Sequence, residues 1–224
     1  MKTVSQTVGS RKPRLLVVDD SVVAREGMIA IINRDARYVF CGAAADRGAT
    51  FALIEQCQPD LVLVEPFLGN GDGLFFIKEL ANRFLQTQIL VISKQPEQIY
   101  AVRALRAGAS GYWMKTGKCE ELIHAIETVI KGGVYVSHGI ALLAVHKLLE
   151  HPATCDAADS LTDRELHVFG MIGAGFGTNR IAKELGISPR TVETYDEHIK
   201  FKLGYPDAQA LRRGAREWFT VNHR

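Results

Sequence analysis

The chain has 224 residues, of which 47% are hydrophobic, and this composition supplies enough apolar side chains for one or two folded domains. Its cysteines, Cys41, Cys57, Cys119 and Cys155, stand far apart with no C-x-x-C pair, which argues against a zinc site or a disulfide framework and favours a reducing cytoplasm. No apolar run approaches the roughly 18 residues of a membrane helix, and the polar N-terminus lacks a signal-peptide core, so we expect a cytoplasmic protein without membrane contact.

The formal net charge of +2 is unevenly distributed along the chain. Residues 15–159 carry 13 basic and 17 acidic side chains, a balance of −4. Residues 160–224 carry 10 basic and 8 acidic side chains, a balance of +2. A mildly acidic body followed by a basic end is typical of a signalling module joined to a nucleic-acid-binding module.

Short apolar runs alternate with helical patterns over residues 14–133, the first expected domain. Runs rich in Val, Ile and Leu are typical of buried strands in a parallel sheet. Strands are predicted near 14–19, 38–44, 60–65, 88–93 and 110–114. Helices are predicted near 22–34, 47–57, 73–84, 96–106 and 118–131. Five such units predict an α/β doubly wound sheet of five parallel strands.

Four of these apolar runs end on side chains that can do chemistry. The first run is followed by Asp19 and Asp20, the third by Glu65 and the last by Lys115, while the fourth ends on Ser93. Because ligands bind beyond the carboxyl ends of parallel strands, we expect these groups to gather at one edge of the sheet. Three carboxylates suit a divalent cation such as Mg²⁺, and a lysine ammonium suits a phosphoryl oxygen.

The segment after Gly132-Gly133 is expected to connect two domains. A helix is predicted over residues 138–149, and the sequence HPATCDAADS that follows has no apolar periodicity. We therefore expect residues 134–159 to form a linker helix and a linker.

Residues 160–220 form the second expected domain, which is small and all-α. Thr162 and Glu165 match a T-x-x-E capping box at the start of a helix over 163–173. A second helix is predicted over 178–185, and Ser188-Pro189 is typical of the start of a third. Two short helices joined by a turn that contains Gly186 indicate a helix-turn-helix, whose second helix would enter the DNA major groove.

Three segments resemble the NarL/FixJ branch of bacterial response regulators, and the resemblance covers nearly the whole chain. PDLVLVEPFLGNGDGL resembles the region of a receiver's phosphoacceptor strand, GASGYWMKTG the last receiver strand, and LTDRE to IKFKLG a LuxR-type DNA-binding domain. The resemblance implies a flavodoxin-like receiver domain that controls dimerisation and promoter binding. By position, it implies that Asp19 and Asp20 hold Mg²⁺, that Ser93 and Lys115 contact the phosphoryl group, and that Tyr112 is an aromatic switch.

Glu65 departs from the family pattern, in which an aspartate accepts the phosphoryl group. One extra methylene moves the carboxylate outward by up to roughly 1.5 Å, about one C–C bond. A misplacement of about 1 Å can cost on the order of 10²-fold in rate, so we predict that phosphotransfer to Glu65 is lost or very slow. Two interpretations stay open: Glu65 meets Lys115 and Ser93 and partly replaces a phosphoryl group, or the pocket is vestigial. Tyr112 is similarly either a switch or a half-buried core aromatic.

The predicted recognition helix carries side chains that can read DNA bases. We expect Arg190, Glu193, Thr194 and Glu197 on its groove-facing side, because Arg binds guanine, Glu accepts from cytosine and Thr touches the thymine methyl. Residues 196–198 read Asp-Glu-His where family members often carry basic residues, and this change weakens attraction to phosphate.

Contacts to the DNA backbone are expected from basic side chains and from the amides at a helix start. The expected phosphate contacts are Arg180, Lys183, Ser188, Lys200 and Lys202. The alternative interpretation of all these charges is a solvated helix face.

The sequence as a whole predicts a transcription regulator, not an enzyme, that acts independently of phosphorylation and requires no cofactor. Its expected partners are double-stranded promoter DNA and a second copy of the chain, and its input is concentration, a histidine kinase or other regulator, or a small ligand. The main alternative is a protein-interaction adaptor that titrates a partner regulator without binding DNA. Residual phosphotransfer through Asp60 or Asp72 is a further alternative, although Asp60 lies at the wrong end of its strand.

Overall fold

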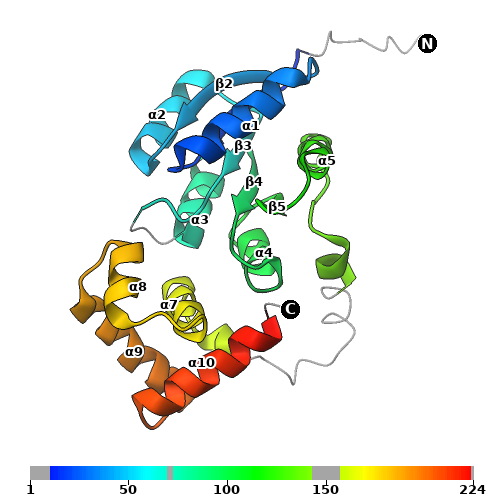
Figure 1. The fold of residues 1–224 in the computed structure, drawn as a ribbon. Helices are drawn as coiled ribbons and strands as arrows, with labels where there is room; N and C mark the ends of the chain where they lie inside the picture. Colours follow the sequence, from blue (N-terminus) through cyan, green and yellow to red (C-terminus); the bar gives the residue numbers. More distant parts are fainter. Residues whose placement is uncertain (1–10, 70–72, 143–156, 223–224) are drawn as a thin grey trace.

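The computed structural model describes residues 11–69, 73–142 and 157–222. An α/β unit is followed by a smaller unit made of helices, and the two lie against each other (Figure 1). No helix among these residues is long and apolar enough to cross a membrane.

The α/β unit is built on one sheet in which every pairing is parallel. Its five strands run in the order β2-β1-β3-β4-β5. They are β1 (Arg14–Val18), β2 (Val39–Ala44), β3 (Leu61–Val64), β4 (Gln88–Ser93) and β5 (Gly111–Met114). The predicted doubly wound sheet is confirmed, and each strand lies within a residue or so of its expected place.

Helices cover both faces of this sheet because the strands are apolar on both sides. Leu15 and Val17 pack with α1 and α5, whereas Leu16 and Val18, which alternate with them, pack with α2, α3 and α4. The helices are α1 (Val22–Arg34), α2 (Arg47–Cys57), α3 (Gly73–Arg83), α4 (Glu97–Arg106) and α5 (Cys119–Ile130). Each of them was predicted.

The carboxyl ends of the strands meet at one edge, as the alternation of strands and helices predicts. Backbone hydrogen bonds continue the sheet one residue past the strands: Glu65 N donates to Val18 O at 2.8 Å, and Lys115 N donates to Ser93 O at 2.8 Å. These bonds fix the backbone position from which Glu65 and Lys115 extend. The functional groups at the ends of β1, β3, β4 and β5 therefore lie side by side.

The second unit contains η1 (Ala157–Ser160), α7 (Asp163–Gly173), α8 (Thr178–Leu185), α9 (Pro189–Leu203) and α10 (Ala208–Asn222). The capping box is present: Thr162 Oγ1 accepts from Glu165 N at 3.4 Å, and Glu165 Oε2 accepts from Thr162 N at 2.8 Å. Gly186 adopts a φ of 57°, a conformation that glycine takes without strain, and ends α8. Ser188 caps α9 with Pro189 at its first turn. The helix-turn-helix is therefore where it was predicted.

The structure adds one helix to the predicted set and leaves the predicted linker untested. Helix α10 was not predicted; its Leu211 is 1% exposed and lies in the core. Residues 138–142 are helical, but the rest of the expected helix to Leu149 and most of the linker lie outside the described residues. The expected domain boundaries therefore stay a prediction.

Candidate functional site

Glu65 stands at the centre of the pocket at the carboxyl edge of the sheet and is only 7% exposed. Both of its carboxylate oxygens have partners. Oε1 accepts from Ser93 Oγ at 3.1 Å and from the Phe67 backbone N–H at 3.2 Å. Oε2 lies 2.8 Å from Lys115 Nζ. The longer side chain thus reaches both groups that the sequence had placed beside it.

Lys115 joins two carboxylates of this pocket. Its Nζ lies 2.6 Å from Asp19 Oδ2 as well as 2.8 Å from Glu65. Asp19 is fully buried, and its other oxygen accepts from Ser21 N at 2.9 Å at the start of α1. The ammonium therefore holds β1, β3 and β5 together through side chains.

The charges of this cluster depend on burial. Burial raises the pKa of Glu65 even though Lys115 opposes the shift. Burial alone would lower the pKa of Lys115, but the Glu65 and Asp19 carboxylates outweigh it and hold that pKa above its usual value. Lys115 therefore stays cationic at neutral pH and is the counter-ion that opposes the effect of burial on Glu65.

The three carboxylates do not converge in the way the predicted magnesium site requires. Asp20 is exposed, and its Oδ2 accepts from Gly69 N at 3.3 Å, while Asp19 and Glu65 share Lys115. Across the described residues, no three acidic, histidine or cysteine side chains are arranged to hold a metal ion. Because Mg²⁺ needs oxygen ligands that are free to turn toward it, this donor set does not fit the ion, and we assign no step to it.

Ser93 and Tyr112 connect the pocket to the loop between β4 and α4. Ser93 Oγ accepts from Gln95 N at 3.3 Å, and Tyr112 Oη donates to Gln95 O at 2.8 Å. The Tyr112 ring is 1% exposed and is part of the core on the α4 side of the sheet. Its position is that of a core aromatic whose hydroxyl is fixed to this loop.

The candidate DNA-reading face lies on α9. Arg190, Glu193, Thr194 and Glu197 are all exposed, whereas Val192 on the opposite side is fully buried. The four predicted base-reading residues lie together, and among the described residues their side-chain hydrogen bonds are local, such as that from Thr194 Oγ1 to Arg190 O at 3.0 Å.

Not every predicted phosphate contact is equally available. Lys202 Nζ lies 2.6 Å from Glu165 Oε2 in the capping box, and Lys200 Nζ lies 2.8 Å from Glu197 Oε1. The Arg180 guanidinium lies over the Phe176 ring at 3.8 Å from its centroid. Lys183 and Ser188 are exposed. Of these side chains, Lys202 is the one that forms an ion pair with a buried carboxylate, and it is therefore the least available for a phosphate contact.

Comparison with known proteins agrees with both halves of this architecture. The family model "Response regulator receiver domain" matches residues 15–127, and that of the "Bacterial regulatory proteins, luxR family" matches residues 159–215. The oxygen regulatory proteins NreC of Staphylococcus haemolyticus and Staphylococcus aureus are 30% and 31% identical, each over 85% of this chain and 90% and 91% of their own length. The chain is a response regulator of the LuxR type.

Solved response regulators share its fold. RcsB of Salmonella typhimurium matches 93% of this chain and 98% of its own with a TM-score of 0.64 at 20% identity. A LuxR-family response regulator from Aurantimonas sp. SI85-9A1 matches 62% of this chain and all of its own, with a TM-score of 0.57 at 29% identity. The first comparison supports the fold alone, because the identity is low.

The contacts between the receiver and the DNA-binding domain were not expected from the sequence. Arg103 on α4 donates to Leu161 O at 3.0 Å, to Asp163 Oδ1 at 2.9 Å and to Ala158 O at 2.9 Å. Gln95 lies 3.2 Å from His167 on α7. No sequence signal marks these residues, because their meeting depends on how two separately folded units dock.

Asp196 also differs from its expected place among the groove-facing charges. It is half-buried, and burial raises its pKa to about 6, although Arg212 and Lys200 oppose the shift. Of the expected acidic stretch, Glu197 and His198 are exposed, so the acidic character of the reading face is smaller than the sequence alone suggests.

Proposed function

We propose that this response regulator binds promoter DNA as a homodimer and acts without transfer of a phosphoryl group to its receiver. Glu65 stands where the resemblance to the family places the phosphoacceptor aspartate. The pocket around it is otherwise complete in Asp19, Ser93 and Lys115, and this combination carries the proposal.

The contacts of Glu65 favour imitation of a modified aspartate over a vestigial pocket. The family resemblance gives a hydroxyl and an ammonium to a bound phosphoryl group, and in this chain Ser93 Oγ and Lys115 Nζ contact the Glu65 carboxylate at 3.1 and 2.8 Å. The carboxylate brings one negative charge, against about −1.5 to −2 for a phosphate group. Glu65 therefore carries less charge than a phosphorylated aspartate but contacts the same two groups, Ser93 and Lys115.

The same contacts oppose phosphotransfer. Attack on phosphorus needs one carboxylate oxygen free to approach in line with the leaving group. In this pocket one Glu65 oxygen is held by Lys115 and the other by Ser93 and the Phe67 amide. An incoming phosphodonor would have to displace one of them from a nearly closed pocket.

The test is incubation with acetyl phosphate and Mg²⁺ followed by intact mass measurement. We expect no added mass on the native protein, and an addition of about 80 Da, one HPO₃, on Glu65→Asp. A stable addition on the native protein that disappears in Glu65→Gln would overturn the proposal.

Promoter binding is tested by gel shifts against the protein's own upstream region across a salt series. The exposed face of α9 supports tight binding that weakens steeply with salt, because phosphate contacts release counter-ions. Binding by native protein without a phosphodonor, and weaker binding by unphosphorylated Glu65→Asp, is the expected result. No binding even at low salt would favour the adaptor function instead.

The homodimer is proposed from the family. Structures of RcsB include two dimers bound to two parallel DNAs, and that protein shares the fold at 18% identity. A histidine kinase, another regulator or a small ligand would then supply the input. Light scattering of the native chain at several concentrations checks the dimer.

A further inference from the structure

One large aromatic side chain of the DNA-binding domain takes no part in the packing of the described residues. Phe201 on α9 is 89% exposed, the highest value among their exposed large apolar side chains. It belongs to neither hydrophobic core cluster and to no aromatic pair among those residues. A single exposed apolar side chain is ordinary on a protein surface, so its meaning depends on where it lies.

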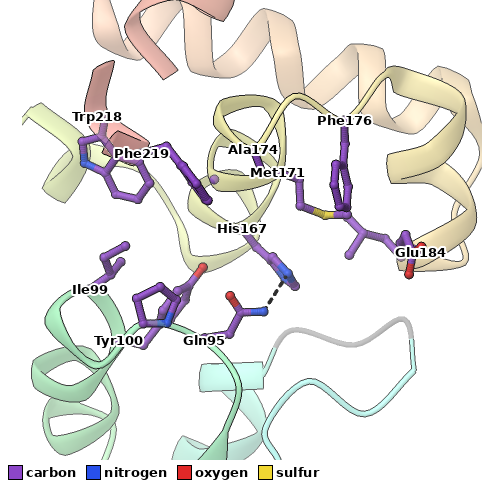
Figure 2. A pocket seen from close by; sticks show the side chains of 13 residues that line it. Gln95, Ile99, Tyr100, His167, Met171, Ala174, Phe176, Glu184, Trp218 and Phe219 are labelled. Atoms are coloured by element: carbon purple, nitrogen blue, oxygen red, sulfur yellow. Dashed lines mark hydrogen bonds between the residues drawn. The ribbon is translucent and has the colours of Figure 1, made fainter. Parts of the chain in front are cut away.

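The other aromatic side chains of this domain serve its core or its contact with the receiver. The core holds Phe169, Tyr195, Tyr205 and Trp218. Phe176 and Phe219 line a cavity between the two domains (Figure 2). Phe201 is therefore the aromatic side chain of the domain that is left for a partner outside the chain.

Phe201 continues the exposed row of α9 that carries the predicted base-reading residues. It lies seven residues after Thr194 and four after Glu197, which are the spacings of neighbours on one face of a helix. Val192 and Ile199 lie on the opposite side of α9 and are fully buried. The ring thus faces the same way as the side chains expected to enter the major groove.

The major groove offers one apolar group to a side chain on this row. The edges of the base pairs present hydrogen-bond donors and acceptors, and in addition the 5-methyl group of thymine. A phenyl ring forms no conventional hydrogen bond and gains free energy only by covering apolar surface. Phenylalanine is one of the residues that contact the thymine methyl group in protein–DNA complexes.

We propose that Phe201 reads DNA sequence by packing against thymine methyl groups in the major groove, so that the bound site contains a T·A pair beneath this ring. The inference rests on the proposed promoter binding and adds a residue that determines its specificity. Glu197, one turn before the ring, would accept from cytosine in the same groove.

A second copy of the chain is a poorer fit for this surface. Glu197 lies one turn before Phe201, and Glu193 lies two turns before it. In a symmetric contact the same patch meets itself, so these carboxylates would approach their own copies and oppose association. The groove instead presents the amino group of cytosine, a donor for carboxylates, beside the methyl groups.

The test measures whether the Phe201 ring and the thymine methyl groups depend on each other. The native full-length protein first selects its binding sequence from a library of random DNA duplexes. The selected duplex is then made once with thymine and once with uracil, which differs from thymine only in lacking the 5-methyl group. Fluorescence anisotropy gives the Kd of native protein and of Phe201→Ala for both duplexes.

Phe201→Ala should lose affinity mainly for the thymine duplex. Covering one methyl group is worth roughly 4-fold in affinity, so the loss on the thymine duplex should exceed that on the uracil duplex roughly 4-fold or more. Methyl contacts of Thr194 are present in both proteins and cancel in this comparison. Phe201→Leu keeps an apolar side chain and should retain most of the preference for thymine.

Leu85→Ala is the matched control for the loss of an exposed apolar side chain. Leu85 is 80% exposed but belongs to the receiver, so its replacement should leave the affinity for both duplexes unchanged. Light scattering of Phe201→Ala at several concentrations should match that of the native protein, because the ring is assigned to DNA and not to a second copy.

Two results would overturn the role of Phe201 alone: equal affinity changes of Phe201→Ala on the two duplexes, or a lower oligomeric state of this variant, which would make the ring a contact between copies. If the native protein selects no sequence, promoter binding fails and the role of Phe201 fails with it. A selected site without dependence between the ring and the methyl groups therefore separates the two failures.

Discussion

At the scale of single residues, the receiver pocket depends on one added methylene and one cation. Glu65 and Asp19 are buried carboxylates, and Lys115 is the ammonium between them, with 12% of its side chain exposed. Removing one partner from a buried ion pair is expensive because the remaining charge is left without water or a counter-ion. The pocket is thus a structural element of the receiver.

Lys115→Met should lower the free energy of unfolding by about 3 kcal/mol, as for other buried pairs that lose one partner. The raised pKa of Glu65 sets the pH dependence. A carboxyl whose folded pKa is raised stabilises the fold below its ordinary pKa and loses this contribution as pH rises through the folded value. The destabilisation should therefore be largest above neutral pH and shrink on acidification, as measured by urea unfolding at several pH values.

Lys131→Met is the matched control for this variant. Lys131 also pairs with a carboxylate, Glu127, but its side chain is 71% exposed, so its loss should change stability by less than about 1 kcal/mol. Equal losses in the two variants would contradict the view that the Lys115 pair is buried and structural.

At the scale of elements, the DNA-binding domain depends on the close approach of α7 and α10. A side chain at Gly173 would collide with the backbone of Ala215 and the side chain of Phe219. Glycine is thus required for packing at this position, since nothing in its backbone conformation demands it. Helix α9 packs on the same core through Val192 and Ile199, so its placement depends on this contact.

Gly173→Ala should destabilise the DNA-binding domain by about 1–3 kcal/mol, the usual cost of overpacking a core. Gly27→Ala in α1 is the control: no atom lies within 4 Å of its added methyl group, and alanine favours helices by about 0.5–1 kcal/mol. Thermal unfolding should therefore show a loss for the first variant and none for the second. A neutral Gly173→Ala would mean that α7 and α10 lie further apart than described.

At the scale of the whole molecule, the docked domains leave the DNA-reading face open. The interdomain hydrogen bonds join α4 and the adjacent loop to η1, α7 and the residues between them (Figure 1). Arg190 and Glu197 on α9 stay exposed in this arrangement. Docking is therefore compatible with DNA binding, in agreement with the proposed independence from phosphorylation.

Arg103→Met should separate the domains, because one guanidinium bonds three groups of the opposite domain at 2.9–3.0 Å. Small-angle scattering should show a larger radius of gyration than for the native chain. Arg106→Met, an exposed change on the same helix, should leave the radius unchanged. If Arg103→Met is as compact as Arg106→Met, the domains are held by other contacts.

The sequence by itself determined the elements of the receiver, the helix-turn-helix and the membership of the receiver pocket, but not helix α10. Buried parallel strands must be apolar on both faces, and their carboxyl ends must share an edge, so Asp19, Glu65, Ser93 and Lys115 could be placed together from their positions alone. The caps at Thr162 and Ser188 are local, since each joins residues three apart, and they fixed the helix starts for the same reason.

Only the tertiary structure decided which partners these side chains choose. Asp20 accepts from the Gly69 amide, Lys202 pairs with Glu165, and Gln95 meets His167. Each of these contacts joins residues that are distant in sequence. Such contacts depend on how the surfaces dock and on the direction in which each side chain points. Neither of these produces a periodic pattern or a fixed residue spacing that could be recognised in the sequence.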